Sequence, residues 1–326
     1  MTVTFPLFKL ESSLEDGFCQ WERAAPAGRR GDRGTAGAAL DRETETRDDY
    51  SMRFGSLIAP GEIPRRGDSG PAVREIQEWL CLHDFGLVID GQFGPATERQ
   101  LKAFQARAYT PAEELGRAGP RTIASLQAPV HRAFGRPPAL NSGPKFYTAI
   151  ETIALQHLAE RPREVGGPNM GPWVRAYMRG KEGPAWPWCL GAVRAIVEAA
   201  AAVSSVDVSW IPETYSCDVL ATAAGTRLYP GAEVARYLTD EDRRQAERVG
   251  LKYHRLPVAG IFLVRAAPND WTHAGVVIDA EWGGSSWLFH TIEGNSNTEG
   301  SRDGYEMVRR IRRAKSSLDY IPLAVF

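Results

Sequence analysis

The stretch PAWPWCLGAV, residues 184–193, places Cys189 where a loop rich in proline and tryptophan gives way to an apolar helix. Val193, Ile196 and Ala200 follow the cysteine at the i+4, i+7 and i+11 positions, so all four residues share one face of the predicted helix. We expect that face to pack on a sheet. A helix N-terminus favours a thiolate and offers free amides to an oxyanion, so Cys189 is a candidate nucleophile.

The chain around this helix changes character from helical to extended. Helical patterns begin at residue 147, whereas the segments GIFLVRA, HAGVVIDAE, SWLFHTIEGN, YEMVRRIRR and YIPLAVF near the C-terminus have β character. Helices followed by antiparallel strands indicate an α+β domain, which we assign to residues 147–326.

A cysteine nucleophile needs a base close to it in space. Of the six histidines, His273 and His290 lie in predicted strands. Strand alternation places the side chain of His273 on one face of its strand. On the following strand it places Glu293 and Asn295 together on one face and His290 on the opposite face. The sequence therefore predicts His273 as the base, with Glu293 or Asn295 as its orienting partner.

Each of these residues also has a purely structural interpretation. A buried cysteine near a helix start often only packs, His273 alone could be a core histidine, and the EGN segment could form a hairpin turn. Trp186 and Trp188 are predicted to wall a substrate cleft. The remaining cysteines are expected to pack or to lie in unstructured sequence, and none forms a CxxC pair: Cys19, Cys81 and Cys217. No metal and no cofactor is expected.

The first half of the chain divides into three parts. Residues 1–58 mix glycine, alanine and charges without a sustained period and predict a flexible extension. Residues 59–128 contain three short helical patterns that begin near a proline, and they predict a compact helical domain. Residues 129–146 are rich in proline and glycine and predict a linker.

Composition excludes several classes of protein. Apolar residues make up 43% and charged residues 24% of the 326 residues, and the formal net charge is −1. This balance indicates a globular protein that binds neither nucleic acid nor an anionic membrane surface. No run of about 18 apolar residues predicts a membrane span. The N-terminus lacks the features of a secretory signal, so we expect synthesis in the cytoplasm.

Residues 59–128 resemble the peptidoglycan-binding domain type 1 family. The resemblance is carried by RRGDSGPAVREIQEWL, DFGLVIDGQFGPATERQLKAFQ and GPRTIASL. Asp90, Gly91 and Gly94 are expected to build the turn between the first two helices rather than to contact ligand. The family repeats a DGxxG turn before its third helix, and EELGRAGP stands there in this chain. The resemblance implies that this domain binds the bacterial cell wall.

Residues 147–323 resemble the CHAP family of cysteine amidohydrolases and peptidases. The segments WPWCLGAVRAIV, SCDVLATAAG, HAGVVIDA and HTIEGNSN carry the resemblance, although CLGAV replaces the common CAAFV and VAGIFLV replaces PGDIVFF. The family implies a papain-like fold, with Cys189 as nucleophile, His273 as base and Glu293 and Asn295 as supporting residues.

Together these features predict a peptidoglycan hydrolase that cuts an amide bond of the peptide stem through a cysteine acyl-enzyme. The bond is either the N-acetylmuramoyl-L-alanine amide or a peptide bond. An endolysin-like monomer that reaches the wall after cell lysis is the first interpretation. The alternatives are a delivered interbacterial toxin with the same chemistry, which would have an immunity protein or a secretion component as partner, and a non-catalytic wall-binding protein.

Overall fold

The structure is a computed structural model that describes residues 54–108, 112–137, 139–140, 143–231, 233–234, 255–256, 258–283, 286–297 and 304–325. Most of the predicted N-terminal extension lies outside these residues, as do Cys19 and His254. Phe54 and Ile58 are buried, and the Phe54 ring lies 4.7 Å from that of Phe134. Residues 54–58 therefore belong to the folded body, and the boundary predicted at residue 58 is too late.

Three helices form the N-terminal part of the described chain: α2 (Pro71–Leu82), α3 (Pro95–Arg107) and α4 (Pro120–Phe134), with a short 3-10 turn, η1 (Ala112–Glu114), before the last. Each begins with a proline at its first helical position, where a backbone N–H would make no hydrogen bond within the helix, so its absence costs nothing. Their apolar faces meet in a core that includes Ile76, Leu80, Leu101 and Leu126. This arrangement is the predicted three-helix domain.

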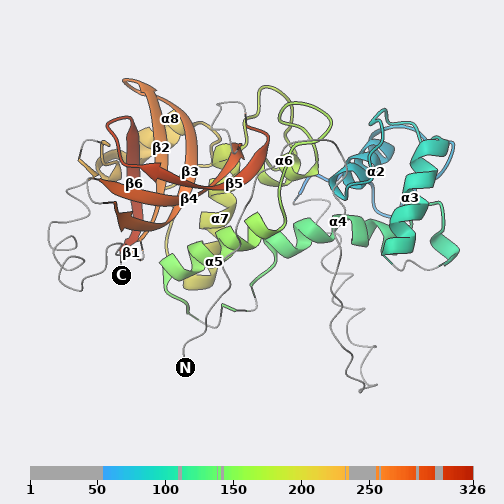
Figure 1. Cartoon of the computed structure of the whole chain (residues 1–326), viewed down its shortest axis with the longest axis horizontal. Coiled ribbons are helices and arrows are strands. Elements are labelled where there is room, and N and C mark those ends of the chain that lie inside the picture. Colours follow the sequence, from blue (N-terminus) through green and yellow to red (C-terminus); the bar gives the residue numbers. More distant parts are fainter. Residues whose placement is uncertain are drawn as a thin grey trace, which may run out of the picture. The chain divides into compact units, whose positions relative to one another are not determined.

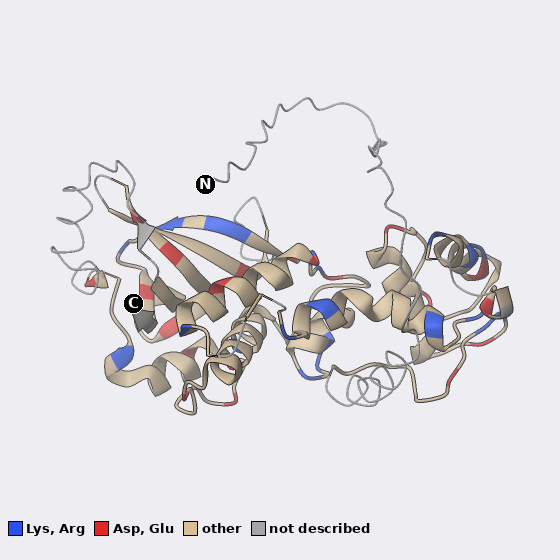
Figure 2. Cartoon of the chain, turned by 90° about the horizontal axis from the view of Figure 1, so that it is seen from below, with Lys and Arg blue, Asp and Glu red and all other residues tan. Residues whose placement is uncertain are grey.

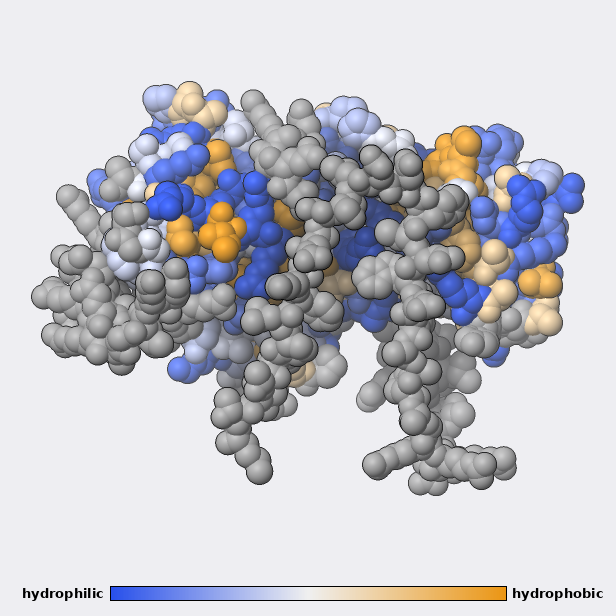
Figure 3. Space-filling view, viewed as in Figure 1, coloured by the Kyte–Doolittle hydropathy of each residue, from blue (hydrophilic) through white to orange (hydrophobic). Residues whose placement is uncertain are grey.

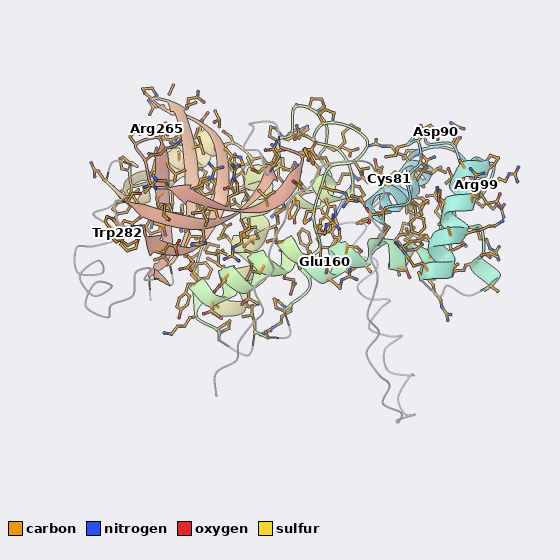
Figure 4. The ribbon with its side chains drawn as sticks, in the orientation of Figure 1. Cys81, Asp90, Arg99, Glu160, Arg265 and Trp282 are labelled. Carbon is orange, nitrogen blue, oxygen red and sulfur yellow. The ribbon has the colours of Figure 1, made fainter. Side chains whose placement is uncertain are left out.

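The turn between α2 and α3 is built around the buried side chain of Gln77. Its carbonyl oxygen accepts from the amides of Asp90 (3.1 Å) and Gly91 (2.8 Å), and its amide group donates to Asp90 Oδ1 (2.8 Å) and Thr97 Oγ1 (3.1 Å). Gly91 has a φ of 70°, a conformation that glycine adopts without strain. Asp90, which Figure 4 labels on this loop, and Gly91 thus build the turn, as the sequence predicts.

The loop EELGRAGP, residues 113–120, repeats this construction without the DGxxG motif. Gln105 Oε1 accepts from the amide of Gly116 (2.8 Å), and Gln105 Nε2 donates to Thr122 Oγ1 (3.0 Å). Gly116 has a φ of 82°. Each turn is therefore held by a glutamine from the helix that precedes it. The departure from the family's motif leaves the hydrogen bonds of this loop intact.

Helix α4 continues beyond the predicted domain boundary. It runs to Phe134 with Pro129 inside it, so the linker predicted to start at residue 129 begins within a helix. Val130 and Ala133 are buried, and this burial explains why the helix persists past a proline. Gln156 also donates to the carbonyl oxygens of the last turn, those of Arg132, Ala133 and Gly135.

The C-terminal part begins with four helices: α5 (Phe146–Ala159), α6 (Pro172–Tyr177), α7 (Cys189–Ser204) and α8 (Cys217–Ala224). A 3-10 turn, η2 (Gly225–Arg227), follows α8. Figure 1 shows α5 and α7 along one face of the sheet, where both contribute to the core. Within the described ranges, none of the helices is long and apolar enough to cross a membrane.

The strands form one antiparallel sheet in the order β5-β4-β3-β2-β6, and the short β1 pairs with β3. They are β1 (Arg255–Leu256), β2 (Val258–Ala267), β3 (Asp270–Trp282), β4 (Trp287–Ser296), β5 (Glu306–Arg313) and β6 (Leu318–Val325). Helices followed by an antiparallel sheet match the predicted α+β class.

Alternate residues of the strands serve two separate cores. One face packs against α5 and α7 and includes Ile261, Val276 and Ile292. The other face carries an aromatic cluster that includes Phe262, Phe289 and Tyr320. Arginines gather on β5, the blue strand at the edge of the sheet in Figure 2. On the face seen in Figure 3, apolar residues form only small groups among hydrophilic ones.

A buried arginine joins the helical domain to the C-terminal part. Arg175 of α6 is 1% exposed and donates to Glu78 of α2 (2.7 Å) and to Glu182 (2.8 Å). Arg74 binds the same two carboxylates, at 2.7 and 2.8 Å. These charges compensate one another at a site that is shielded from water. Residues 54–134 therefore pack directly on the C-terminal part and are not connected to it by a flexible linker alone.

Candidate active site

Cys189 is the first residue of α7 and is 4% exposed. Trp188 caps the helix without a side-chain hydrogen bond to its amides, so the first turn keeps free N–H groups. Pro187 disfavours the helical conformation for Trp186, the residue before it, so the helix begins only after Pro187. The Leu-Gly-Ala-Val run that follows Cys189 is buried. The sulphur therefore lies at the positive end of a 16-residue helix.

His273 on β3 faces Glu293 on β4, as strand alternation predicts. His273 Nε2 lies 3.0 Å from Glu293 Oε2, and the imidazole also hydrogen bonds Cys189. Because Nε2 faces the carboxylate, Nδ1 is the nitrogen left for the sulphur. The structure thus connects sulphur, imidazole and carboxylate from α7, β3 and β4 in one chain of contacts.

Gly275 makes room for this arrangement. It lies two residues after His273 on the same face of β3, beside Glu293. A Cβ at this position would lie 2.9 Å from Glu293 Cγ and 2.4 Å from Phe262 Cε1. Only glycine fits between the carboxylate and the aromatic ring.

Arg312 of β5 fixes the Glu293 carboxylate. Its Nε and Nη2 each donate to one carboxylate oxygen, both at 2.6 Å, and Thr291 Oγ1 donates at 2.7 Å. Burial alone would raise the pKa of Glu293, but the hydrogen bonds from Arg312 and His273 outweigh it and lower the pKa to about 2. Glu293 is therefore a fixed anion with defined geometry. Nothing in the predicted strand YEMVRRIRR distinguishes Arg312 from its neighbouring arginines, so its contact with Glu293 could not be predicted locally.

The protonation of the cysteine and histidine is coupled. Burial lowers the pKa of His273, but the hydrogen bonds that its imidazole makes to Cys189 and Glu293 outweigh burial and raise the pKa to about 9. A hydrogen bond from Cys217, opposed by burial and aided by His273 and the amide of Ala274, holds the pKa of Cys189 well below its usual value. The two shifts run in opposite directions, and both favour the charged forms of the two side chains.

Cys217 is a second residue close to the site that local sequence did not indicate. It is the first residue of α8, it is buried, and it hydrogen bonds Cys189. That bond and burial raise the pKa of Cys217, so it stays a thiol and donates S–H to the Cys189 thiolate. Asp218 accepts from the amide of Trp271 (2.7 Å), which ties α8 to the strand that carries His273. Cys217 packs in the core, as expected, and it also lies close enough to Cys189 to shift the pKa of both thiols.

Asn295 occupies a different position from the one predicted. It has a φ of 52° and lies where the β4–β5 pairing shifts between Glu293 and Ser296. Among the described residues it makes no hydrogen bond to His273, and its buried Oδ1 has no partner. The positive φ and the register shift interrupt the strand alternation on which the prediction for Asn295 rests, and Glu293 is the residue that contacts His273.

The two tryptophans before Cys189 have separate environments. Trp188 is 0% exposed, stacks on Tyr177 with ring centroids 5.4 Å apart, and donates to Glu164 Oε1 (2.9 Å). Trp188 is therefore a core residue, and the prediction that it walls the substrate cleft is wrong. Trp186 is half-buried and lines a cavity with Tyr215 and Lys181, and its contact with substrate stays a prediction.

The other titratable candidates lie elsewhere. Cys81 is on α2 of the helical domain (Figure 4), where its sulphur contacts the Leu87 carbonyl at 3.5 Å. His157 is fully buried in α5 and bonds the Tyr177 hydroxyl. His290 is buried on β4, where its Nε2 lies 3.4 Å from Glu281 Oε1. In the part of the chain that the structure describes, no group of three or more His, Cys, Asp or Glu side chains could hold a metal ion.

The helical domain has a recognisable family. Residues 69–126 match the putative peptidoglycan binding domain. This match assigns the three-helix domain and indicates association with the bacterial cell wall. The chain matches no curated protein and no solved structure.

Proposed function

We propose that this protein is a cysteine-dependent peptidoglycan hydrolase that cleaves an amide bond of the peptide stem. The observation that carries the proposal is the chain of contacts from Cys189 through His273 to Glu293, buried at the start of α7. The match of residues 69–126 to a peptidoglycan binding domain supports the choice of substrate. We place its action at the cell wall, after synthesis in the cytoplasm and release.

The proposed reaction begins with the Cys189 thiolate. The sulphur attacks the amide carbonyl, and the free amides in the first turn of α7 are placed to stabilise the oxyanion that develops. His273, protonated beforehand, gives its proton to the departing amine, and an acyl-enzyme remains. His273 then takes a proton from water, which attacks the thioester and frees Cys189.

Glu293 and Arg312 act on the base rather than on the substrate. Glu293 accepts from Nε2 of His273 and so keeps Nδ1 toward the sulphur throughout the cycle. Arg312 holds the carboxylate with two hydrogen bonds and prevents it from rotating toward the sulphur. A thiolate, an imidazolium and an orienting group placed in this order resemble the arrangement in papain-like enzymes.

Digestion of purified sacculi tests the proposal. The wild-type protein should release soluble fragments, and mass spectrometry of those fragments distinguishes a muramoyl–alanine cut from a peptide cut. Cys81→Ala is the matched control, because Cys81 lies in the helical domain away from the site. Intact sacculi after incubation with folded wild-type protein would instead support a wall-binding protein without catalysis.

A further inference from the structure

Two buried thiols meet where α7 and α8 begin. Cys189 is the first residue of α7 and Cys217 is the first residue of α8, and the two residues are 4% and 6% exposed. Both cysteines are free, and the Cys217 S–H donates a hydrogen bond to the Cys189 sulphur. The proposed hydrolysis uses only Cys189 as nucleophile, so the Cys217 thiol stands beside it without a part in that reaction.

The position of Cys217 beside the nucleophile is fixed by the fold. Both α7 and α8 pack against β3, the strand that carries His273. Ser216 caps α8 with a side-chain hydrogen bond, and Asp218 Oδ1 accepts from the amide of Trp271 on β3 (2.7 Å). The first turn of α8 is therefore held against the strand of the catalytic base, and Cys217 is held with it.

One cavity borders the chain next to both cysteines. It has a volume of about 650 Å³, and its lining includes Pro187, two residues before Cys189, and Ser216, the residue before Cys217. A peroxide is much smaller than the amide substrate that must reach the Cys189 sulphur in the proposed hydrolysis. A route that serves the substrate therefore also admits a peroxide.

The charge on Cys189 controls how the two thiols react. The hydrogen bond from Cys217 is the main reason that the pKa of Cys189 is lowered, and the thiolate that results is the form that peroxides oxidise. The pKa of Cys217 is raised by its hydrogen bond to Cys189, by burial and by the Cys189 charge. Oxidation of Cys189 to a sulphenic acid removes that charge, so the pKa of Cys217 falls when its sulphur becomes the next nucleophile.

We propose that Cys189 and Cys217 form a reversible disulfide when a peroxide oxidises the protein. The Cys189 thiolate attacks one oxygen of hydrogen peroxide, the O–O bond breaks, and the products are a sulphenic acid and hydroxide. The Cys217 sulphur then attacks the Cys189 sulphur, the S–O bond breaks, and the hydroxyl group leaves as water with the Cys217 proton. The two sulphurs thus supply the two electrons that reduce the peroxide.

The disulfide has two consequences for the protein. It blocks the nucleophile of the hydrolase proposed above, and the biological meaning of the inference rests on that function. It also protects Cys189 from further oxidation to sulphinic acid, which thiols do not reverse. A dithiol reductant returns both thiols by exchange, so the protein regains its nucleophile.

Peptide mapping of the full-length protein tests the disulfide without any substrate. In the Cys19→Ala/Cys81→Ala variant, Cys189 and Cys217 are the remaining cysteines. The reduced protein is treated with hydrogen peroxide, alkylated, and digested with trypsin in the absence of reductant. Mass spectrometry then shows whether the two tryptic peptides that carry the cysteines are joined, and these are residues 182–194 and 195–227.

We expect the two peptides to be joined after peroxide and to separate after a dithiol reductant, with the free Cys189 thiol recovered. Lysis of sacculi by the same samples should be lost and then restored. Cys217→Ser in this background keeps a hydrogen-bond donor beside the thiolate but cannot form the disulfide. At the peroxide dose that oxidises the parent fully, the Cys189 thiol recovered after reduction should fall by at least about half.

Three results would overturn the inference. They are a Cys189 thiol that survives peroxide, oxidised Cys189 without joined peptides, and equal recovery of the Cys189 thiol in the parent and in Cys217→Ser. The proposed hydrolysis fails separately, if the reduced wild-type protein leaves sacculi intact.

Discussion

His273 Nε2 lies 3.0 Å from Glu293 Oε2, and this approach depends on a glycine between neighbouring strands. Gly275→Ala would place a methyl group 2.9 Å from Glu293 Cγ and 2.4 Å from Phe262. Because both neighbours are buried, the carboxylate must move and the imidazole loses its orientation. We expect the rate of wall lysis to fall at least about tenfold, with a loss of stability of about 1–3 kcal/mol.

Gly86→Ala is the control for this substitution. Its added Cβ would meet no atom within 4 Å. Lysis rates and urea unfolding curves of the two variants separate the local effect from a general one. Full activity of Gly275→Ala would mean that the His273–Glu293 contact does not limit catalysis.

Glu293 and His290 lie on opposite faces of β4, and their glutamine variants should differ sharply. Glu293→Gln keeps the size of the side chain but removes the charge that Arg312 holds beside His273. We expect at least about a tenfold fall in the initial lysis rate for Glu293→Gln and a small change for His290→Gln. Circular dichroism checks that both variants fold. A dead His290→Gln variant beside an active Glu293→Gln variant would exclude the assignment of Glu293 as orienting residue.

The pH dependence of the reaction should report the thiolate and the imidazolium. His273 has a raised pKa of about 9, so activity that needs the protonated imidazole should be lost as the pH rises through about 9. The pKa of Cys189 is lowered, so activity should persist at acidic pH until the thiolate is protonated. Cys217→Ala removes the S–H donor to the thiolate, so the acidic limb should move to higher pH.

Alkylation of Cys189 by iodoacetamide as a function of pH measures this acidic limb directly. The Cys19→Ala/Cys81→Ala double variant provides the background, in which only Cys189 and Cys217 can react. An acidic limb that is the same with and without Cys217 would show that the second cysteine does not stabilise the thiolate.

Arg175 should be a major determinant of stability. It is buried between Glu78 and Glu182, and Arg175→Met would leave these carboxylates without their main cation. We expect a loss of about 3–5 kcal/mol in the free energy of unfolding. Arg179→Met, at a half-exposed position, is the matched control and should cost less than about 1 kcal/mol. Equal urea midpoints for the two variants would contradict this role of the buried network.

The parts of the fold that local sequence controls could be predicted. Proline at the first helical position marks each helix of the wall-binding domain, and strict alternation along β3 and β4 brings His273 and Glu293 to one face. Both signals arise from backbone geometry within a few residues. The order of helices before an antiparallel sheet follows from the same local patterns.

The residues that were missed depend on contacts between distant segments. Cys217 reaches Cys189 because two helix starts converge, and Arg312 reaches Glu293 across a strand pair. Asn295 lies at a bulge that interrupts strand alternation, and Trp188 is buried where Tyr177 stacks on it and Glu164 accepts its N–H. The proline within α4 likewise concealed a helix that tertiary burial maintains.

The most direct test of the central claim is the lysis of purified sacculi by Cys189→Ala. If the Cys189 thiolate is the nucleophile, this variant should fold, bind the sacculi and release no soluble fragments above background. The wild type in the same assay should release fragments cut at one kind of amide bond. Release of the same fragments by folded Cys189→Ala at a rate near that of the wild type would contradict the account.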